Sequence, residues 1–217
     1  PSVRDELDGE EDHEPADREA CNDPLHRAIP PHRRDARTVG PMRRVVCSAF
    51  APLDQLVVEE APDPEPGPGQ VVVAVEAAGV NFVDALLVQG LYQITPPLPF
   101  TPGMEVAGAV AAVGDGVEGV AVDDRVLATG FAGGYATHAV VPAGALSPIP
   151  AGLGAAQAAA LVQSYATMLF ALTRRTQVRA GEWVAVLGAG GGIGLATVDL
   201  AVALGARVVA CASSEEK

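Results

Sequence analysis

The feature that most restricts the fold of this chain is a glycine cluster set between two apolar runs. Residues 184–187 read Val-Ala-Val-Leu and are followed by Gly188-Ala189-Gly190-Gly191-Gly192-Ile193-Gly194. A short run without polar residues is typical of a strand buried on both faces of a parallel sheet. A helix is predicted at 193–204, closed by Gly205, and a second buried strand at 207–211. This order is that of a β-α-β unit, the opening of a doubly wound domain.

The cluster fits the dinucleotide-binding fingerprint in two frames. Read as G-x-G-x-x-G, it has Ala189 at the first position; read from Gly188, it is G-x-x-G-x-x-G. Glycine lets the backbone approach a pyrophosphate, and the helix N-terminus supplies N–H donors. A glycine-rich turn without a ligand is the alternative, but the flanking strand and helix meet the context that the fingerprint requires. We therefore predict that the cofactor contacts Gly188, Ala189, Gly191, Gly192, Ile193 and Gly194.

The end of the second predicted strand distinguishes between nicotinamide cofactors. NAD sites usually carry Asp or Glu there, about 20 residues after the glycines, to hold the ribose 2′-hydroxyl. This chain has Ala212, Ser213 and Ser214 at that place, followed by Glu215, Glu216 and Lys217. Small hydroxyl side chains leave room for a 2′-phosphate and donate hydrogen bonds to it, and a lysine adds positive charge. Ser213, Ser214 and Lys217 thus predict NADPH as the cofactor. Glu215 and Glu216 are the signal against this prediction.

The part of the chain before these residues divides by composition. Residues 1–41 are dense in Asp, Glu, Arg and Pro and lack a periodic apolar run, which predicts disorder. They are either an over-long gene start ahead of Met42 or an acidic regulatory tail. Residues 42–150 predict an all-β barrel or sandwich, and residues 151–217 the first part of the doubly wound domain. The predicted elements are strands at 44–47, 56–60, 71–75, 109–113, 125–128 and 136–141, and helices at 81–89, 155–162 and 166–174.

Composition excludes several classes of protein. A net charge of −13 disfavours nucleic acid and anionic membranes as partners. Cys21, Cys47 and Cys211 form no CxxC pair, which disfavours a disulfide framework and favours a reducing, cytoplasmic location. The apolar stretch 183–206 contains the glycine cluster, whose backbone groups would lack partners in lipid, so we do not predict a membrane span. Aromatic residues make up only 4% of the chain, so the core must be built mostly from Val, Ala and Leu.

From Met42 to Lys217 the chain resembles the NADPH:quinone oxidoreductases, the zeta-crystallin-like branch of the medium-chain dehydrogenase/reductase superfamily. The matching stretches are AAGVNFVDALLVQGLYQ (77–93), PFTPGMEVAGAVAAVGDGV (99–117), DDRVLA (123–128), GAGGGIGLA (188–196) and ALGARVVACASSEEK (203–217). The resemblance implies an α/β protein in which a GroES-like, partly open barrel precedes a Rossmann domain. It also implies that the chain stops partway through that domain and that the full-length protein is a homodimer.

The resemblance also assigns roles to individual residues. In this family the positions of Asn81 and Tyr92 line the pocket beside the nicotinamide, and that of Thr167 lies along the cofactor. A second pocket tyrosine of some relatives is Leu86 here, which puts the substrate preference in doubt. A tyrosine packed on the barrel without contact to substrate is the alternative for Tyr92.

The same comparison predicts that the protein holds no metal. Zinc-dependent alcohol dehydrogenases of the superfamily carry a catalytic Cys where Asn81 stands and Gly-His-Glu where Gly103-Met104-Glu105 stands. Neither Asn81 nor Met104 is a zinc ligand, and the cysteine cluster of a structural zinc site is absent from the sequence. A structural role is expected for Glu105.

These residues together predict a zinc-free hydride transfer from NADPH to a quinone or a related electron-poor carbonyl or enone. The cofactor supplies the redox chemistry, and the protein positions it. Asn81 and Tyr92 would orient the carbonyl or relay a proton. Two alternatives stay open: an enoyl-thioester or enone reductase of the same superfamily, and a truncated chain without catalytic activity. By itself the 217-residue chain is expected not to turn over NADPH.

Overall fold

A computed structural model describes residues 41–130 and 132–214 of the chain. The chain divides into two units, Pro1–Asp35 and Ala36–Lys217, and every element below belongs to the second unit. The disorder predicted for residues 1–41 lies, apart from Pro41, outside the described residues. So do Glu215, Glu216 and Lys217.

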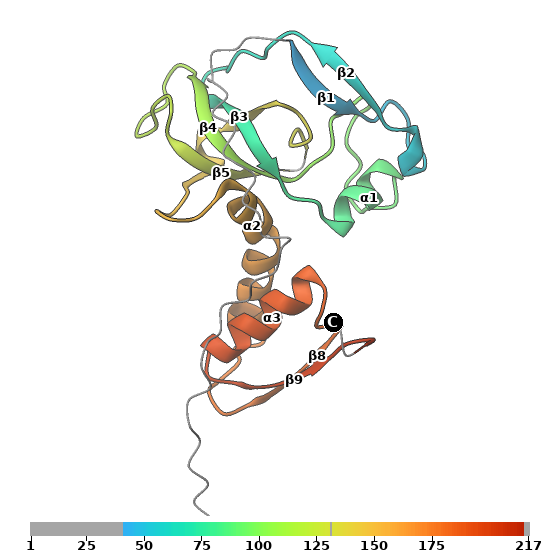
Figure 1. The fold of residues 1–217 in the computed structure, drawn as a ribbon, viewed down its shortest axis with the longest axis vertical. Helices are drawn as coiled ribbons and strands as arrows, with labels where there is room; N and C mark the ends of the chain where they lie inside the picture. The colour runs from blue at the N-terminus through green and yellow to red at the C-terminus, as the bar shows by residue number, and fades with distance from the viewer. Residues whose placement is uncertain (1–40, 131, 215–217) are drawn as a thin grey trace, which may run out of the picture. The chain divides into compact units, whose positions relative to one another are not determined.

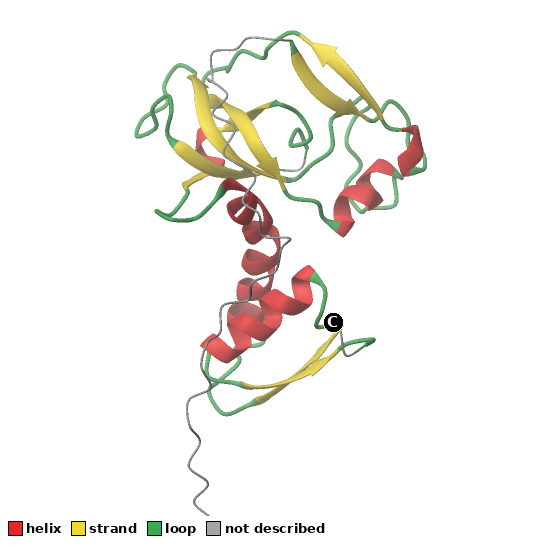
Figure 2. Ribbon diagram, in the orientation of Figure 1, coloured by secondary structure: helices red, strands yellow, loops and turns green. Residues whose placement is uncertain are grey.

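Residues 42–148 form an antiparallel β structure (Figures 1 and 2). A five-stranded sheet has the order β6-β3-β4-β5-β7, and its strands are β3 (Gln70–Ala78), β4 (Glu105–Val113), β5 (Arg125–Thr129), β6 (His138–Pro142) and β7 (Leu146–Pro148). A separate pair joins β1 (Met42–Val46) to β2 (Val57–Ala61). The six predicted strands are all present; β7 was missed because it is only three residues long and ends in proline.

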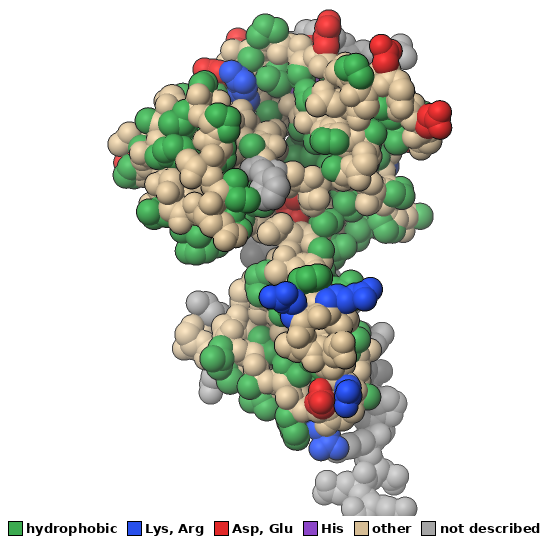
Figure 3. Space-filling view, turned by 180° about the vertical axis from the view of Figure 1, so that it is seen from behind, with side chains coloured by type: hydrophobic (Ala, Val, Ile, Leu, Met, Phe, Trp, Pro, Cys, Tyr) green, Lys and Arg blue, Asp and Glu red, His purple; other side chains and the backbone are tan. Residues whose placement is uncertain are grey.

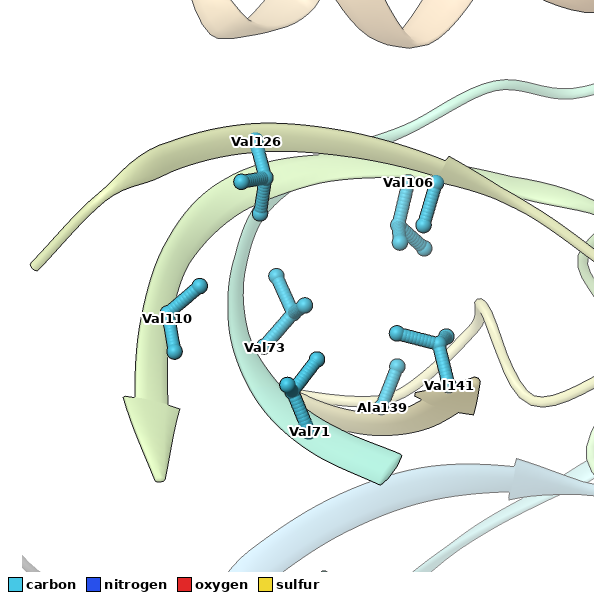
Figure 4. Close-up of a cluster of buried hydrophobic side chains, with 8 residues drawn as sticks. Val71, Val73, Val106, Val110, Val126, Ala139 and Val141 are labelled. Atoms are coloured by element: carbon cyan, nitrogen blue, oxygen red, sulfur yellow. The ribbon is translucent and has the colours of Figure 1, made fainter. Parts of the chain in front are cut away.

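The interior of the larger sheet is built almost wholly from valine. Figure 4 shows side chains from four strands pointing toward one another. Valine suits this place because its branched Cβ packs well on a pleated surface. The prediction of a core poor in aromatic residues is confirmed by the members of this cluster, which are Val71, Val73, Val106, Val110, Val126, Ala128, Ala139 and Val141.

Two helices flank this β structure. The first, α1 (Phe82–Val88), lies within the predicted range 81–89. The second, α2 (Ala155–Phe170), continues directly into a π-helical turn, Ala171–Arg175, so the two ranges predicted as helical, 155–162 and 166–174, are confirmed as parts of one continuous helical stretch. Residues 163–165 are polar and interrupt the apolar pattern. The helix nevertheless continues through them, because glutamine, serine and tyrosine are all compatible with a helix interior, and contacts of Gln163 and Tyr165 also join this stretch to other elements.

Helix α2 covers the outer face of the five-stranded sheet. Ala158 and Ala159 are buried against Ala107, Leu127 and Ile149, and the small alanine side chains allow a close approach. The 21-residue helical stretch Ala155–Arg175 is long and apolar enough to cross a membrane. One such helix is weak evidence for a membrane span, and this stretch is not the one, 183–206, that the sequence singled out.

The predicted β-α-β unit is present. Strand β8 (Trp183–Leu187), helix α3 (Gly192–Ala203) and strand β9 (Arg207–Cys211) follow in order, and β8 pairs with β9 in parallel (Figure 1). The expected burial of both strands is wrong for this chain, because Leu187 on β8 is 82% exposed and Val209 on β9 is 46% exposed. The sheet has two strands, and among the described residues α3 is the element that packs on them.

Charge is unevenly distributed between these parts. From residue 151 onward the described arginines, Arg174, Arg175, Arg179 and Arg207, outnumber the acids Glu182 and Asp199. In Figure 3 the blue side chains gather over this lower part of the molecule. The strong negative charge of the whole chain therefore does not extend to the part that carries the glycine cluster.

Candidate functional site

The glycine cluster forms a tight turn between β8 and α3. Gly188 has a φ of 72°, a left-handed conformation that glycine adopts without steric cost. The N–H of Gly191 donates to the carbonyl of Gly188 at 3.1 Å, and the N–H of Ala189 donates to the carbonyl of Cys211 at 3.0 Å. The turn is thus closed on itself and attached to the end of β9.

Three glycines of the turn have different roles. Gly188 makes the reversal, and Gly191 is the residue that caps the N-terminus of α3. A Cβ on Gly194 would overlap the carbonyl oxygen of Gly188 and lie 2.7 Å from Cα of Ala189, so only glycine lets α3 pack this closely on the turn. The structure therefore selects the frame that starts at Gly188, because Ala189 makes neither the reversal nor the close packing.

A pocket of about 540 Å³ lies at the carboxyl ends of the two parallel strands. Ligands of open α/β sheets bind at this edge, and the volume is within the usual range of about 300–1,000 Å³ for small-molecule sites. The N-terminus of α3 points its free N–H groups at the turn, which favours an anion. The residues that line the pocket are Leu187, Gly188, Gly190, Gly191, Cys211, Ala212 and Ser213.

The structure brings most of the predicted cofactor residues to this place. Gly188, Gly191 and Ser213 line the pocket, and Ser214 follows in the chain. Ala189 is buried under the turn, whereas Gly192, Ile193 and Gly194 form the first turn of α3. Gly190 and Cys211 are lining residues that the sequence did not single out. Lys217 lies outside the described residues.

Thr167 lies on α2, the helix that packs against α3. Its hydroxyl donates to the carbonyl of Gln163 at 2.6 Å, and it is not among the residues that line the pocket. Contact between α2 and the glycine turn is made instead by Ser164, whose Oγ would lie 3.3 Å from a Cβ on Gly192. The Tyr165 hydroxyl adds a hydrogen bond to Asp199 on α3 at 2.9 Å.

Asn81 is the residue that precedes α1, and both its backbone N–H and its side-chain amide donate hydrogen bonds. Its N–H donates to Oδ2 of Asp84 at 2.9 Å, and its Nδ2 donates to Oε1 of Glu105 at 2.9 Å. The neighbouring side chains Val80 and Phe82 are 86% and 81% exposed. An oriented amide between two accessible apolar groups is suited to a flat, partly polar ligand.

A buried polar network surrounds Asn81. Oε2 of Glu105 accepts the backbone N–H of Gln163 at 2.8 Å, and Oδ2 of Asp84 accepts the Tyr135 hydroxyl at 2.8 Å. Burial raises the pKa of Tyr135, and its hydrogen bond to Asp84 adds to the effect, so this phenol stays a neutral donor. Sequence reasoning missed Asp84, Tyr135 and Gln163. The Asn-x-x-Asp spacing of a helix cap was the available signal for Asp84.

Tyr92 lies beyond the other end of α1. The helix spans seven residues, which corresponds to about 10 Å along its axis, so Asn81 and Tyr92 stand at opposite ends of one short element. Tyr92 is half-buried, and its hydroxyl lies 3.5 Å from Nε2 of Gln93. No described contact joins Tyr92 to Asn81.

Within residues 41–130 and 132–214, no three His, Cys, Asp or Glu side chains gather closely enough to hold a metal ion. The position that the zinc enzymes use for a cysteine ligand holds Asn81, which is engaged with Glu105. Met104 is buried in the barrel next to Glu105.

Comparison with known sequences relates both halves of the chain to one group of oxidoreductases. Residues 67–151 match the alcohol dehydrogenase GroES-like domain. The chain is 41% identical over 204 residues to a quinone oxidoreductase-like protein 2 homolog of Nematostella vectensis and covers 55% of its length. It is 44% identical over 154 residues, or 47% of the length, to a quinone oxidoreductase of Rattus norvegicus. A synaptic vesicle membrane protein VAT-1 homolog of the same species is 40% identical over 162 residues, or 40% of its length.

Solved structures lead to the same group. The quinone oxidoreductase of Thermus thermophilus, which was also determined as a complex with NADPH, superposes with a TM-score of 0.71 at 40% identity, over 80% of this chain and 54% of that one. The CurK enoyl reductase superposes with a TM-score of 0.75 at 27% identity, over 82% and 56%. The chain thus spans about half the length of the proteins it matches, and the shared part is a GroES-like barrel with an incomplete Rossmann domain.

Proposed function

We propose that the protein of this chain, which is similar to quinone oxidoreductases of the medium-chain dehydrogenase/reductase superfamily, transfers a hydride from NADPH to a quinone or a related electron-poor carbonyl, without zinc. The observation that carries this proposal is the pocket at the ends of β8 and β9, with the glycine turn on one side and Ser213 on the other. Such a site is built for a phosphate-bearing nucleotide.

The cofactor would be held mainly by backbone groups. The pyrophosphate fits the turn at Gly188–Gly191 and the N-terminus of α3, where the first N–H groups of the helix and its dipole favour negative charge. Ser213 and Ser214 stand where a 2′-phosphate would need donors, and neither is a carboxylate that would repel it. Lys217 is proposed as the charged partner of that phosphate on sequence grounds alone.

The acceptor would bind beside Asn81. Val80 and Phe82 offer apolar surface to a ring, and the Asn81 amide offers polar contacts to its carbonyl groups. Bound NADPH supplies the hydride, and Tyr92 or water would supply the proton that completes reduction. A quinone is already electron-poor, so its reduction does not depend on a Lewis acid, in keeping with Asn81 and Met104 at the ligand positions of the zinc enzymes.

Reduction of an enone or enoyl thioester is the second candidate. It uses the same cofactor, and two observations favour it: the similarity to the CurK enoyl reductase and the presence of Leu86 where some quinone reductases have a pocket tyrosine. A screen of quinones, enones and enoyl thioesters with the protein at the full length of its relatives decides between the two acceptor classes.

The proposal is tested first at the cofactor site. The single tryptophan, Trp183, lies on β8 and reports binding through quenching of its fluorescence as NADPH is added. We expect saturable binding that Gly191→Ala weakens at least about tenfold, because the methyl group would occupy the phosphate side of the turn. Gly144→Ala is the matched control, since a Cβ there meets nothing within 4 Å. Failure of the wild-type chain to bind NADPH or NADH at millimolar concentration would refute the cofactor assignment.

A cytoplasmic location and a homodimer in the full-length protein are part of the same proposal. They rest on composition and resemblance, while some relatives carry the name of a vesicle membrane protein. Cell fractionation and light scattering measure the two properties directly.

A further inference from the structure

A buried carboxylate lies between Asn81 and the helix that leads to the glycine turn. Glu105, on β4, is only 3% exposed. Its Oε1 accepts from Asn81 Nδ2 at 2.9 Å, and its Oε2 accepts from the backbone N–H of Gln163 on α2 at 2.8 Å. Both oxygens are therefore engaged, each with a donor from a different element.

We propose that Glu105 is a positioning residue that fixes the orientation of the Asn81 amide and ties it to helix α2. A carboxylate only accepts hydrogen bonds, so the amide must turn its nitrogen toward Glu105 and its oxygen away. One rotamer and one polarity of the amide are thereby selected before any ligand arrives. The catalytic relevance of this orientation rests on the proposed function, in which Asn81 contacts the acceptor.

The surroundings of Glu105 leave it little freedom to move. A Cβ on Gly79 would overlap both the Glu105 carboxylate and the carbonyl of Ala159, so the chain at Gly79 is pressed against β4 and α2. The N–H of Gly79 also donates to the carbonyl of Glu105 at 3.0 Å. Buried charge held by two donors in so tight a space is expensive to rearrange.

Helix α2 extends this tie to the cofactor side. Gln163 bonds Glu105, the next residue Ser164 approaches Gly192 in the glycine turn, and Tyr165 bonds Asp199 on α3. Residues 163–165 thus contact, in order, Glu105 of the barrel, Gly192 of the glycine turn and Asp199 of α3. Through them, the position of the Asn81 amide is set relative to the place where the nucleotide would bind.

The decisive experiment replaces Glu105 by glutamine, which keeps the size and exchanges one acceptor oxygen for a donor. The new NH₂ group then faces a donor, so either one of the two hydrogen bonds breaks or the Asn81 amide flips and turns its oxygen toward position 105, which reverses its polarity. Nuclear magnetic resonance of the 217-residue chain measures the Asn81 side-chain NH₂ signals and the exchange of the Gln163 amide. We expect shifted Asn81 signals, or exchange of the Gln163 N–H at least about tenfold faster. Glu76→Gln, the same change at an exposed position of β3, should alter neither signal.

A second variant tests the pairing itself and covers the case in which Glu105→Gln folds poorly. Asn81→Asp alone places two carboxylates face to face and should destabilise the chain. Combined with Glu105→Gln, it restores both bonds: the new amide donates to the new carboxylate and accepts from Gln163. The thermal midpoint and the Gln163 protection should therefore recover in the double variant. Additive losses, or a Glu105→Gln variant with unchanged Asn81 and Gln163 signals, would overturn the proposal.

Cofactor binding separates this proposal from the proposed function. Glu105→Gln leaves the glycine turn intact, so its affinity for NADPH should stay within about twofold of wild type. If the wild-type chain binds no nucleotide, the proposed function fails, while the signals of Asn81 and Gln163 still decide the role of Glu105.

Discussion

At the scale of single residues, glycine decides what the proposed cofactor site can be. Gly188 supplies the reversal, Gly191 leaves its outer side open to a ligand, and Gly194 permits the contact between α3 and the turn. The three positions look alike in the sequence, but their surroundings differ, and substitutions at them should therefore fail in different ways.

The first prediction compares two of these glycines. Gly194→Ala forces a Cβ onto the Gly188 carbonyl and should lower both the thermal midpoint and cofactor binding. Gly191→Ala places its Cβ at an ordinary 3.5 Å from that oxygen, with an ordinary backbone φ of −89°, and should lower binding alone. Calorimetry and NADPH titration of both variants measure the difference. Equal loss of stability in the two variants would contradict these assigned roles.

The second prediction concerns the choice of cofactor. Ser213→Asp places a carboxylate on the pocket wall, where it would repel a 2′-phosphate and accept from a free 2′-hydroxyl. We expect the ratio of NADPH to NADH affinity to fall at least about tenfold, and Lys217→Ala to weaken NADPH about ten- to hundredfold while sparing NADH. Fluorescence titration with both cofactors measures each ratio. A wild-type preference for NADH, or equal weakening of both cofactors, would show that this loop does not bind the phosphate.

At the scale of elements, buried polar contacts connect segments that are distant in the chain. Tyr135, in the loop before β6, bonds Asp84 on α1, and Glu105 on β4 bonds the backbone of α2. Because Glu105 also accepts from the Asn81 side chain, the start of α1 is held by both Tyr135 and Glu105.

The third prediction follows from the raised pKa of Tyr135. Because burial and Asp84 raise this pKa above the value of about 10 in the unfolded chain, the unfolded state loses its proton first as the pH rises. The free energy of unfolding should thus be fully maintained below pH ~10 and fall above it. Tyr135→Phe should lower stability at neutral pH by about 1–3 kcal/mol and flatten the alkaline decline.

Urea unfolding at several pH values measures that profile. Tyr165→Phe is the control, because the pKa of Tyr165 is also raised, mainly through its hydrogen bond to Asp199, but this side chain is only partly buried and should contribute less. An alkaline decline as steep in Tyr135→Phe as in the wild type would assign the effect to other groups.

At the scale of the whole molecule, the β-rich part and the β-α-β unit are not equally well packed. The barrel has a closed valine cluster, whereas β8 and β9 leave Trp183, Leu187 and Val209 exposed. Among the described residues no further strand pairs with β8 or β9, so each of the two has an open edge, which is a template for association.

The fourth prediction is that the 217-residue chain does not by itself oxidise NADPH at a steady rate and that it self-associates as its concentration rises. Absorbance of NADPH with a quinone present measures the first property, and sedimentation the second. Leu187→Lys, on the exposed face of β8, should reduce association. Sustained NADPH oxidation by this chain would show that the site needs no further residues.

The sequence determined the elements whose signal is local. Valine-rich strands between prolines and glycines, the apolar run before the glycine cluster and the helix after it were all predicted, because each depends on neighbours in the chain. What only the tertiary structure decided depends on distant partners. Gln163 and Tyr165 of α2 bond to Glu105 and Asp199, which are distant in the chain, and Gly188 rather than Ala189 starts the fingerprint because of its backbone reversal. Asp84 and Tyr135 are 51 residues apart in the sequence, so their hydrogen bond exists only in the folded chain. In the sequence Asp84 looks like part of an ordinary helix cap, and only the tertiary structure shows that it belongs to the candidate site.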